Sequence, residues 1–303
     1  MKVLFVWALT CLIWSTVWLF IKIGLQDLPP ISFAGIRLVI AVAILFPVIL
    51  ARRIRLPRRG RDWLLIAVTG LILLGLNYGL VFSGARYISS GLTAVLQAAT
   101  PGFALIFGHF LLPDERFTLL KLSAIGLGIF GVAVIFSDQL SVSGWPAFLG
   151  CAAVAAGALC VAFAYVIVKA YGNHLPPTVL TAGQMLCGMV PLMTVGLLWE
   201  GNPLAFRWTP AAIGSLLYLA LAGSVAAFWL NYWLLKRMEA TKVMAMSLVE
   251  PLLAVLLGAV VLSERLSVQA LLGGAFIVTS IGLILSRGVD RQPEVKALES
   301  REA

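Results

Sequence analysis

The sequence is poor in charged residues. Only 12% of its 303 residues are Asp, Glu, Lys or Arg, whereas 61% are hydrophobic and the mean hydropathy is +1.02. A chain with so little charge is not expected to cover a globular surface with solvated side chains. The composition therefore predicts a membrane protein.

Cysteine, histidine and catalytic motifs are also scarce. The four cysteines fall in apolar stretches without CxxC spacing, which disfavours disulfides and zinc sites. The sequence contains no GxSxG, HExxH or GxxxxGK[ST] motif. We therefore expect no catalytic residues, no metal site, no cofactor and no hydrolysis of ATP by this chain.

Long apolar stretches follow one another along most of the chain. A helix of about 20 apolar residues crosses the hydrocarbon core of a bilayer, which is about 30 Å thick. The expected fold is an all-α integral membrane protein with ten transmembrane helices. The predicted spans are 3–24, 30–50, 63–83, 90–112, 117–136, 145–168, 177–199, 211–235, 242–262 and 267–286.

The net charge of +9 is concentrated outside these spans, most densely at residues 51–61, where six arginines occur. Such a cluster can bind nucleic acid, but its position between two spans indicates a cytoplasmic loop that meets anionic lipid headgroups. Placing the N-terminus in the cytoplasm puts most Lys and Arg residues on the inner side. We therefore predict two cytoplasmic termini, a disordered polar tail at 288–303, and a lipid bilayer, not nucleic acid, as partner.

Two pieces of sequence recur about half a chain length apart. KIGLQDLPP at 22–30 matches KAYGNHLPP at 169–177 with the same spacing from Lys to Pro. Pro101 and Pro251 are each followed, near the end of their span, by a Glu-Arg pair: Glu115 and Arg116 in one half, and Glu264 and Arg265 in the other. Leu76-Asn77-Tyr78 and Leu230-Asn231-Tyr232 also look alike, but they are out of register with the prolines, so this match is set aside.

Each repeat therefore holds five spans, and because five is odd, the second copy enters the membrane from the opposite side. Inverted repeats are typical of transporters whose two halves exchange inward-facing and outward-facing shapes around one central site. The alternative is a gene duplication that only builds a stable bundle.

The motifs resemble those of a known family. They are Trp14-Ser15, Lys22-Ile23-Gly24, Pro29-Pro30 and Arg37, then TAVLQAATPGFALIFGHFLLPDER and MAMSLVEPLLAVLLGAVVLSER. Over residues 3–286 the chain resembles the EamA branch of the drug/metabolite transporter superfamily. The resemblance implies a first EamA repeat at 1–140 and an inverted second repeat at 141–287. Helices 1–4 and 6–9 would surround a central cavity, and helices 5 and 10 would be peripheral. It also implies export of small metabolites or toxic amphiphiles across the bacterial inner membrane.

Two charges lie within spans, where a central charge costs about 2.5–3.5 kcal/mol and needs a partner or a function. Arg37 lies about 10 Å from the outer face and Glu250 about 13 Å from the inner face, so the two side chains can meet. Three interpretations stay open: a functional pair, a structural ion pair between the halves, or an Arg37 that reaches the headgroups.

Polar and aromatic residues at similar depth complete the predicted cavity. An aromatic and hydrogen-bonding lining suits an amphipathic solute such as an amino acid or an aromatic cation. Alternatively, each of these residues joins helices. The cavity residues are Trp14, Arg37, Asn77, Tyr78, Gln97, Thr100, Gln184 and Glu250. Pro101 and Pro251 are predicted gating residues, because proline frees a helix carbonyl, although proline is also common in membrane helices.

These observations predict a secondary membrane transporter. We expect it to export small amphipathic metabolites, such as amino acids or related amines, by alternating access. The alternatives are an intramembrane enzyme or lipid-handling protein, and a receptor or scaffold without transport. The expected partners are a small-molecule substrate and protons, with Glu250 as either the proton-coupling carboxylate or the carboxylate that binds a cationic group. A monomer and a homodimer are both compatible with the sequence.

Overall fold

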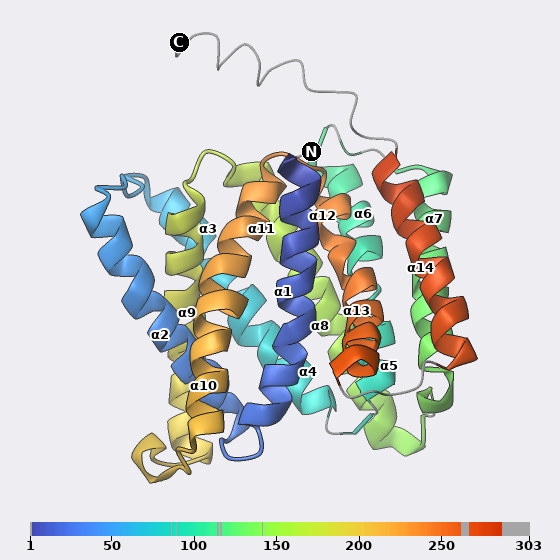
Figure 1. Cartoon of the computed structure of the whole chain (residues 1–303). Coiled ribbons are helices and arrows are strands. Elements are labelled where there is room, and N and C mark those ends of the chain that lie inside the picture. Colours follow the sequence, from blue (N-terminus) through green and yellow to red (C-terminus); the bar gives the residue numbers. More distant parts are fainter. Residues whose placement is uncertain are drawn as a thin grey trace.

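The computed structural model describes residues 2–85, 87–88, 90–113, 115, 117–140, 142–261 and 267–286. Within these residues every regular element is a helix (Figure 1). The expectation of an all-helical membrane fold is therefore confirmed. Arg116, the Glu264-Arg265 pair and the predicted tail at 288–303 lie outside the described residues, as does the side chain of Lys22.

The elements of the first half follow the predicted spans closely. They are α1 (Lys2–Gly24), α2 (Pro30–Ala51), α3 (Gly60–Gly70), η1 (Leu71–Leu76), α4 (Asn77–Ala85), α5 (Ser90–Gln97), α6 (Thr100–Leu111), α7 (Leu119–Ile135) and η2 (Ser137–Gln139). The second half contains α8 (Gly144–Tyr171), α9 (Pro177–Trp199), η3 (Pro203–Ala205), α10 (Pro210–Tyr218), η4 (Leu219–Ala226), α11 (Ala227–Leu235), α12 (Ala240–Met244), α13 (Met246–Val261) and α14 (Val268–Ser286).

Eight helical stretches among the described residues are long and apolar enough to cross a membrane. They are Lys2–Ile21, Pro30–Ala51, Gly60–Val81, Leu92–Leu111, Gly144–Tyr171, Pro177–Trp199, Pro210–Leu235 and Val268–Leu285. A shorter apolar helix covers Leu119–Ile135. The chain is thus a multi-pass membrane protein, and the count of ten spans stays a prediction.

Prolines fix where the matching helices α2 and α9 begin. Pro30 and Pro177 occupy the first helical position, and the preceding prolines are extended, with φ/ψ of −65°/141° and −62°/135°. Proline suits this position because its φ is already helical and the N–H that it lacks has no partner in the first turn. The repeated Leu-Pro-Pro motif therefore builds the same helix start in both halves.

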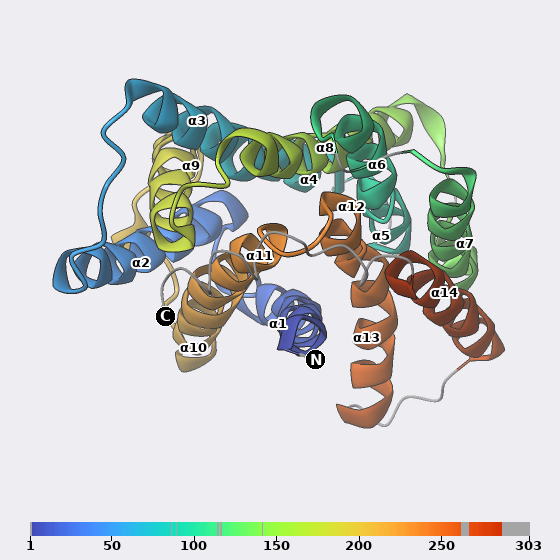
Figure 2. The same ribbon diagram turned by 90° about the horizontal axis from the view of Figure 1, so that it is seen from above.

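The helices of the two halves pack in a matching pattern. In the second half α8 packs against α3, α4 and α6 of the first half, and α1 packs against α10, α11 and α13 in the corresponding way. Helices α2 and α9 pack along each other, and α7 pairs with α14 at one edge of the bundle (Figure 2). The pair α7 and α14 approaches closely at two glycines: a Cβ on Gly273 would lie 2.4 Å from the carbonyl oxygen of Gly131.

A π-helical segment interrupts the third stretch of each half. It is η1 between α3 and α4, and η4 between α10 and α11. Such segments are rare and occur frequently at functional sites. Because each widened turn rotates the helix that follows it, η1 and η4 determine which faces of α4 and α11 point into the bundle.

The proline-bearing stretches are broken as well. The turn Ala98–Ala99 separates α5 from α6, and Pro101 is the second residue of α6. Pro101 has no N–H for the carbonyl of Gln97, and the hydroxyl of Thr100 donates to that oxygen instead, at 2.6 Å. In the second half Ala245 separates α12 from α13, and Pro251 lies inside α13.

Candidate substrate site

Arg37 turns inward from α2. Its side chain is buried, its Nη2 donates to the hydroxyl of Tyr78 on α4, and its Cζ lies 5.3 Å from the centre of the Tyr78 ring. Its Nε is buried without a hydrogen-bond partner among the described residues. The guanidinium is therefore anchored by a phenol, keeps an unused donor, and does not reach out to the headgroups.

Glu250 lies half-buried on α13. It is within electrostatic range of the Cys11 thiol on α1 and of the Tyr165 hydroxyl on α8. The carboxylate thus faces the interior of the bundle, between one helix of each half. The expected pairing of Glu250 with Arg37 stays a prediction.

Gln184 joins three helices. Its side chain is 1% exposed, its Nε2 donates to Thr69 Oγ1 on α3 at 2.6 Å, and its Oε1 accepts from the hydroxyl of Tyr232 on α11. Gly70 permits this approach, because a Cβ there would lie 2.7 Å from the Cα of Gln184. Both polar atoms of the buried Gln184 amide are therefore hydrogen-bonded to other helices, which matches the alternative of a residue that joins helices.

Tyr165 on α8 is a central residue that the sequence did not identify. It is buried, its ring centre lies 5.7 Å from that of Tyr232, and it interacts electrostatically with Tyr78 and Glu250. It therefore lies within electrostatic range of both Tyr78 and Glu250. We call Arg37, Tyr78, Tyr165 and Glu250 the central cluster.

Asn231 lies beside the central cluster and is the second missed residue. It is 0% exposed and adjoins the Tyr165 hydroxyl, yet neither of its amide atoms has a partner in good hydrogen-bond geometry among the described residues. A buried polar group without a partner costs about 1–3 kcal/mol. The sequence contains a signal for it, because Asn231 belongs to the Leu-Asn-Tyr match between residues 76–78 and 230–232.

The remaining predicted residues surround this region with local contacts. Asn77 donates from Nδ2 to the Leu73 carbonyl at 3.3 Å, while its Oδ1 is buried without a partner among the described residues. Trp14 packs edge-on against Phe228, with ring centres 5.9 Å apart. Gln97, Thr100 and Pro101 lie at the break between α5 and α6 and not in the central cluster.

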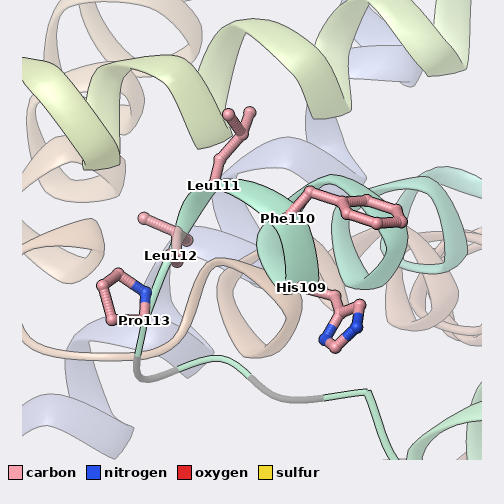
Figure 3. Close-up of a pocket in the computed structure, with 5 residues that line it drawn as sticks. All are labelled: His109, Phe110, Leu111, Leu112 and Pro113. Atoms are coloured by element: carbon pink, nitrogen blue, oxygen red, sulfur yellow. The ribbon is translucent and has the colours of Figure 1, made fainter.

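A surface pocket of about 470 Å³ lies elsewhere, at the end of α6 (Figure 3). It is lined by the consecutive residues His109, Phe110, Leu111, Leu112 and Pro113, and Figure 3 shows His109 and Leu111 pointing in different directions. His109 accepts the backbone N–H of Phe117 at 3.4 Å. None of the predicted cavity residues lines this pocket, so it is not the predicted site.

A known family model matches most of the chain. The model of the EamA-like transporter family matches residues 1–137 and, a second time, residues 148–286. The chain belongs to the EamA-like transporter family. The predicted membership, within the drug/metabolite transporter superfamily, is therefore confirmed.

Relatives of this EamA-like transporter are themselves named as transporters. "Uncharacterized transporter YoaV" of Bacillus subtilis (strain 168) is 30% identical over 271 residues, which cover 89% of this chain and 92% of that protein. "Uncharacterized inner membrane transporter YedA" of Escherichia coli (strain K12) is 30% identical over 278 residues, or 90% of this chain and 87% of that protein. "Probable amino-acid metabolite efflux pump" of Escherichia coli (strain K12) is 27% identical over 282 residues, which cover 90% of this chain and 91% of that protein.

A solved crystal structure has the same fold. Its TM-score to this EamA-like transporter is 0.81, over 96% of this chain and 99% of that chain, at 19% sequence identity. At that identity the likeness concerns the fold alone. Transport as the general function therefore follows from the family and from the named relatives.

Proposed function

We propose that this EamA-like transporter is a secondary carrier that exports small amphipathic metabolites by alternating access. The observation that carries the proposal is the central cluster, in which the Arg37–Tyr78 contact of the first half and Glu250 of the second half both lie within electrostatic range of Tyr165. A cation, a carboxylate and two phenols inside a membrane bundle are costly to bury, and such groups commonly mark substrate and ion pathways.

Alternating access is supported by the relation between the halves. We propose ten spans, with an inverted-repeat boundary between 1–140 and 141–287, because the helix contacts, the π-helical segments and the Leu-Pro-Pro helix starts all match between halves. The two matches to one family model support the same division. Two related halves can exchange shapes around a fixed central site.

The substrate class follows from the chemistry of the cluster. The unused Nε of Arg37 suits a carboxylate, Glu250 suits an ammonium group, and the tyrosine rings suit an apolar or cationic body. Amino acids and related amines combine these groups, and one relative is named for amino-acid metabolites. Export by a carrier, and not an enzymatic reaction, is the proposed activity.

Glu250 is the proposed coupling residue. Its place beside Pro251 puts an ionisable group on a helix that lacks one backbone hydrogen bond, so a change in helix shape can change its access to water. We place both termini in the cytoplasm and the chain in the inner membrane, because the arginine-rich loop at 51–61 marks the cytoplasmic side.

Reconstitution tests the proposal. The purified chain in liposomes is screened for saturable uptake of labelled amino acids, organic amines and nucleosides, with empty liposomes and an Arg37→Leu, Glu250→Gln double variant as controls. We expect saturable uptake of an amino acid or amine that the double variant lacks. Uptake of none of these solutes contradicts the proposed function.

A further inference from the structure

Glu115, between α6 and α7, is a buried carboxylate outside the central cluster. Only 2% of its side chain is exposed. Its Oε1 accepts the backbone N–H of Ala240 at 2.6 Å and lies 3.1 Å from Lys169 Nζ. Its Oε2 accepts from Thr241, at 3.4 Å from the backbone nitrogen and 3.5 Å from the hydroxyl. A carboxylate of the first half is thus fastened to the start of α12 and the end of α8.

The start of α12 is held from several sides. Lys169 also donates to the Met238 carbonyl, Lys121 on α7 lies 2.5 Å from Glu239, and Trp7 on α1 donates to the Lys242 carbonyl at 3.0 Å. Three of these anchoring side chains, Glu115, Lys121 and Trp7, belong to the first half. This end of α12 is therefore a junction between the halves.

The junction holds together one end of the two stretches that carry Pro101 and Pro251. At this end α12 packs against α6. Beyond the break at Ala245, α13 runs outward, and its far end stands away from α5 and α6 (Figure 2). The two stretches that carry Pro101 and Pro251 thus meet at Glu115 and diverge towards the opposite face.

We propose that Glu115 and Lys169 form a latch that keeps the α6–α12 end of the transporter closed. That end opens when Glu115 leaves the backbone of α12, so Glu115 is a positioning residue for transport and does not bind substrate. Gly108 on α6 leaves room for the seated carboxylate, because a Cβ there would lie 3.3 Å from Glu115 Oε2. The inference rests on the alternating access proposed above.

A matched carboxylate provides the control. Glu200, at the end of α9, accepts the backbone N–H groups of Ile31 at 3.0 Å and Ser32 at 2.6 Å, at the start of α2. It has the same chemistry as Glu115, but it joins α2 and α9, which pack along each other. Glu200→Gln therefore removes a carboxylate from a helix start without releasing α12 from α6.

Cysteine accessibility tests the latch. The four native cysteines are replaced by Ala, and Met244→Cys, a 4% exposed position at the end of α12, is labelled with a membrane-impermeant maleimide in right-side-out and inside-out vesicles. Glu115→Gln and Lys169→Met are expected to raise the labelling rate about tenfold from the side on which Glu115 lies, the factor typical of losing a charged hydrogen bond. Glu200→Gln is expected to leave the rate unchanged.

Several outcomes overturn the latch. One is an unchanged rate in Glu115→Gln protein that still melts cooperatively, and another is an equal rise from both sides, which indicates general loosening. If Glu115→Gln does not fold, Gly108→Ala, which presses on the carboxylate, must raise the rate from the same side. Labelling needs no substrate, so it is measured independently of flux. An unchanged labelling rate in the variants, in a protein that transports a solute, refutes the latch alone. A raised labelling rate, in a protein that transports no solute, refutes the carrier alone.

Discussion

Arg37 on α2 donates a hydrogen bond to the hydroxyl of Tyr78 on α4, so the buried cation of the first half is anchored by a phenol of the same half. Tyr78→Phe removes the acceptor and leaves a buried guanidinium with fewer partners. We expect a loss of about 1.5–3 kcal/mol in unfolding free energy, seen as a lower melting temperature in detergent. Tyr171→Phe changes an exposed ring and should melt like the parent. Equal melting of both variants contradicts the anchoring role.

Replacing Glu250 separates a coupling role from a structural role. Glu250→Gln keeps the shape but removes the titration, so a coupling role predicts folded protein that exchanges substrate and no longer responds to a pH gradient. A structural pair with Arg37 predicts poor expression that the additional change Arg37→Leu largely restores, because an unpaired buried charge costs more than an absent pair. Flux in liposomes with and without a pH gradient decides between them; unaltered pH-driven flux in Glu250→Gln rules out the coupling role.

Asn231 and Gln184 are two buried amides with opposite hydrogen bonding. Because neither atom of the Asn231 amide has a partner in good hydrogen-bond geometry among the described residues, Asn231→Leu should keep or raise the melting temperature while lowering transport, if the amide serves the substrate. Gln184→Leu should lower the melting temperature, since it takes the acceptor from the buried Tyr232 hydroxyl and the donor from Thr69 Oγ1, which keeps its bond to the Leu65 carbonyl in its own helix. If Asn231→Leu lowers both the melting temperature and the flux as Gln184→Leu does, the result argues against a substrate role for Asn231.

The contact between α7 and α14 depends on two glycines. Gly273→Ala places a Cβ against the Gly131 carbonyl, and overpacking of this kind costs about 1–3 kcal/mol. Gly126→Ala on α7 is the control, because no described atom beyond its own helix lies within 4 Å of its Cβ position. We expect Gly273→Ala to lower the melting temperature and Gly126→Ala to leave it unchanged or slightly higher.

The proposed orientation has a direct consequence at Pro57, in the arginine-rich loop. With the native cysteines replaced, Pro57→Cys should react with an impermeant thiol reagent in inside-out vesicles and not in intact cells. Labelling from outside an intact cell overturns the orientation, and with it the inverted-repeat proposal.

Much of the fold could be predicted from local sequence. Apolar stretches located the helices, and proline, which fixes φ, located the starts of α2 and α9. The central cluster was only partly predictable. Arg37 and Glu250 were found because charge within a span is rare, but Tyr165 lies in an apolar helix, and its importance depends on which way α8 faces. The rotation of α4 past η1, which brings Tyr78 to Arg37, depends on packing and has no signal in the sequence pattern.

The central claim is that one site is exposed alternately to the two sides of the membrane, and trans-acceleration tests it most directly. Liposomes containing the protein are preloaded with the unlabelled form of whichever amino acid or amine it takes up. The initial rate at which they take up the labelled form is compared with the rate in protein-containing liposomes that hold buffer alone. The account predicts faster uptake in the preloaded liposomes, because a loaded carrier returns more readily. Equal uptake with and without preloading, for every solute that enters, contradicts it.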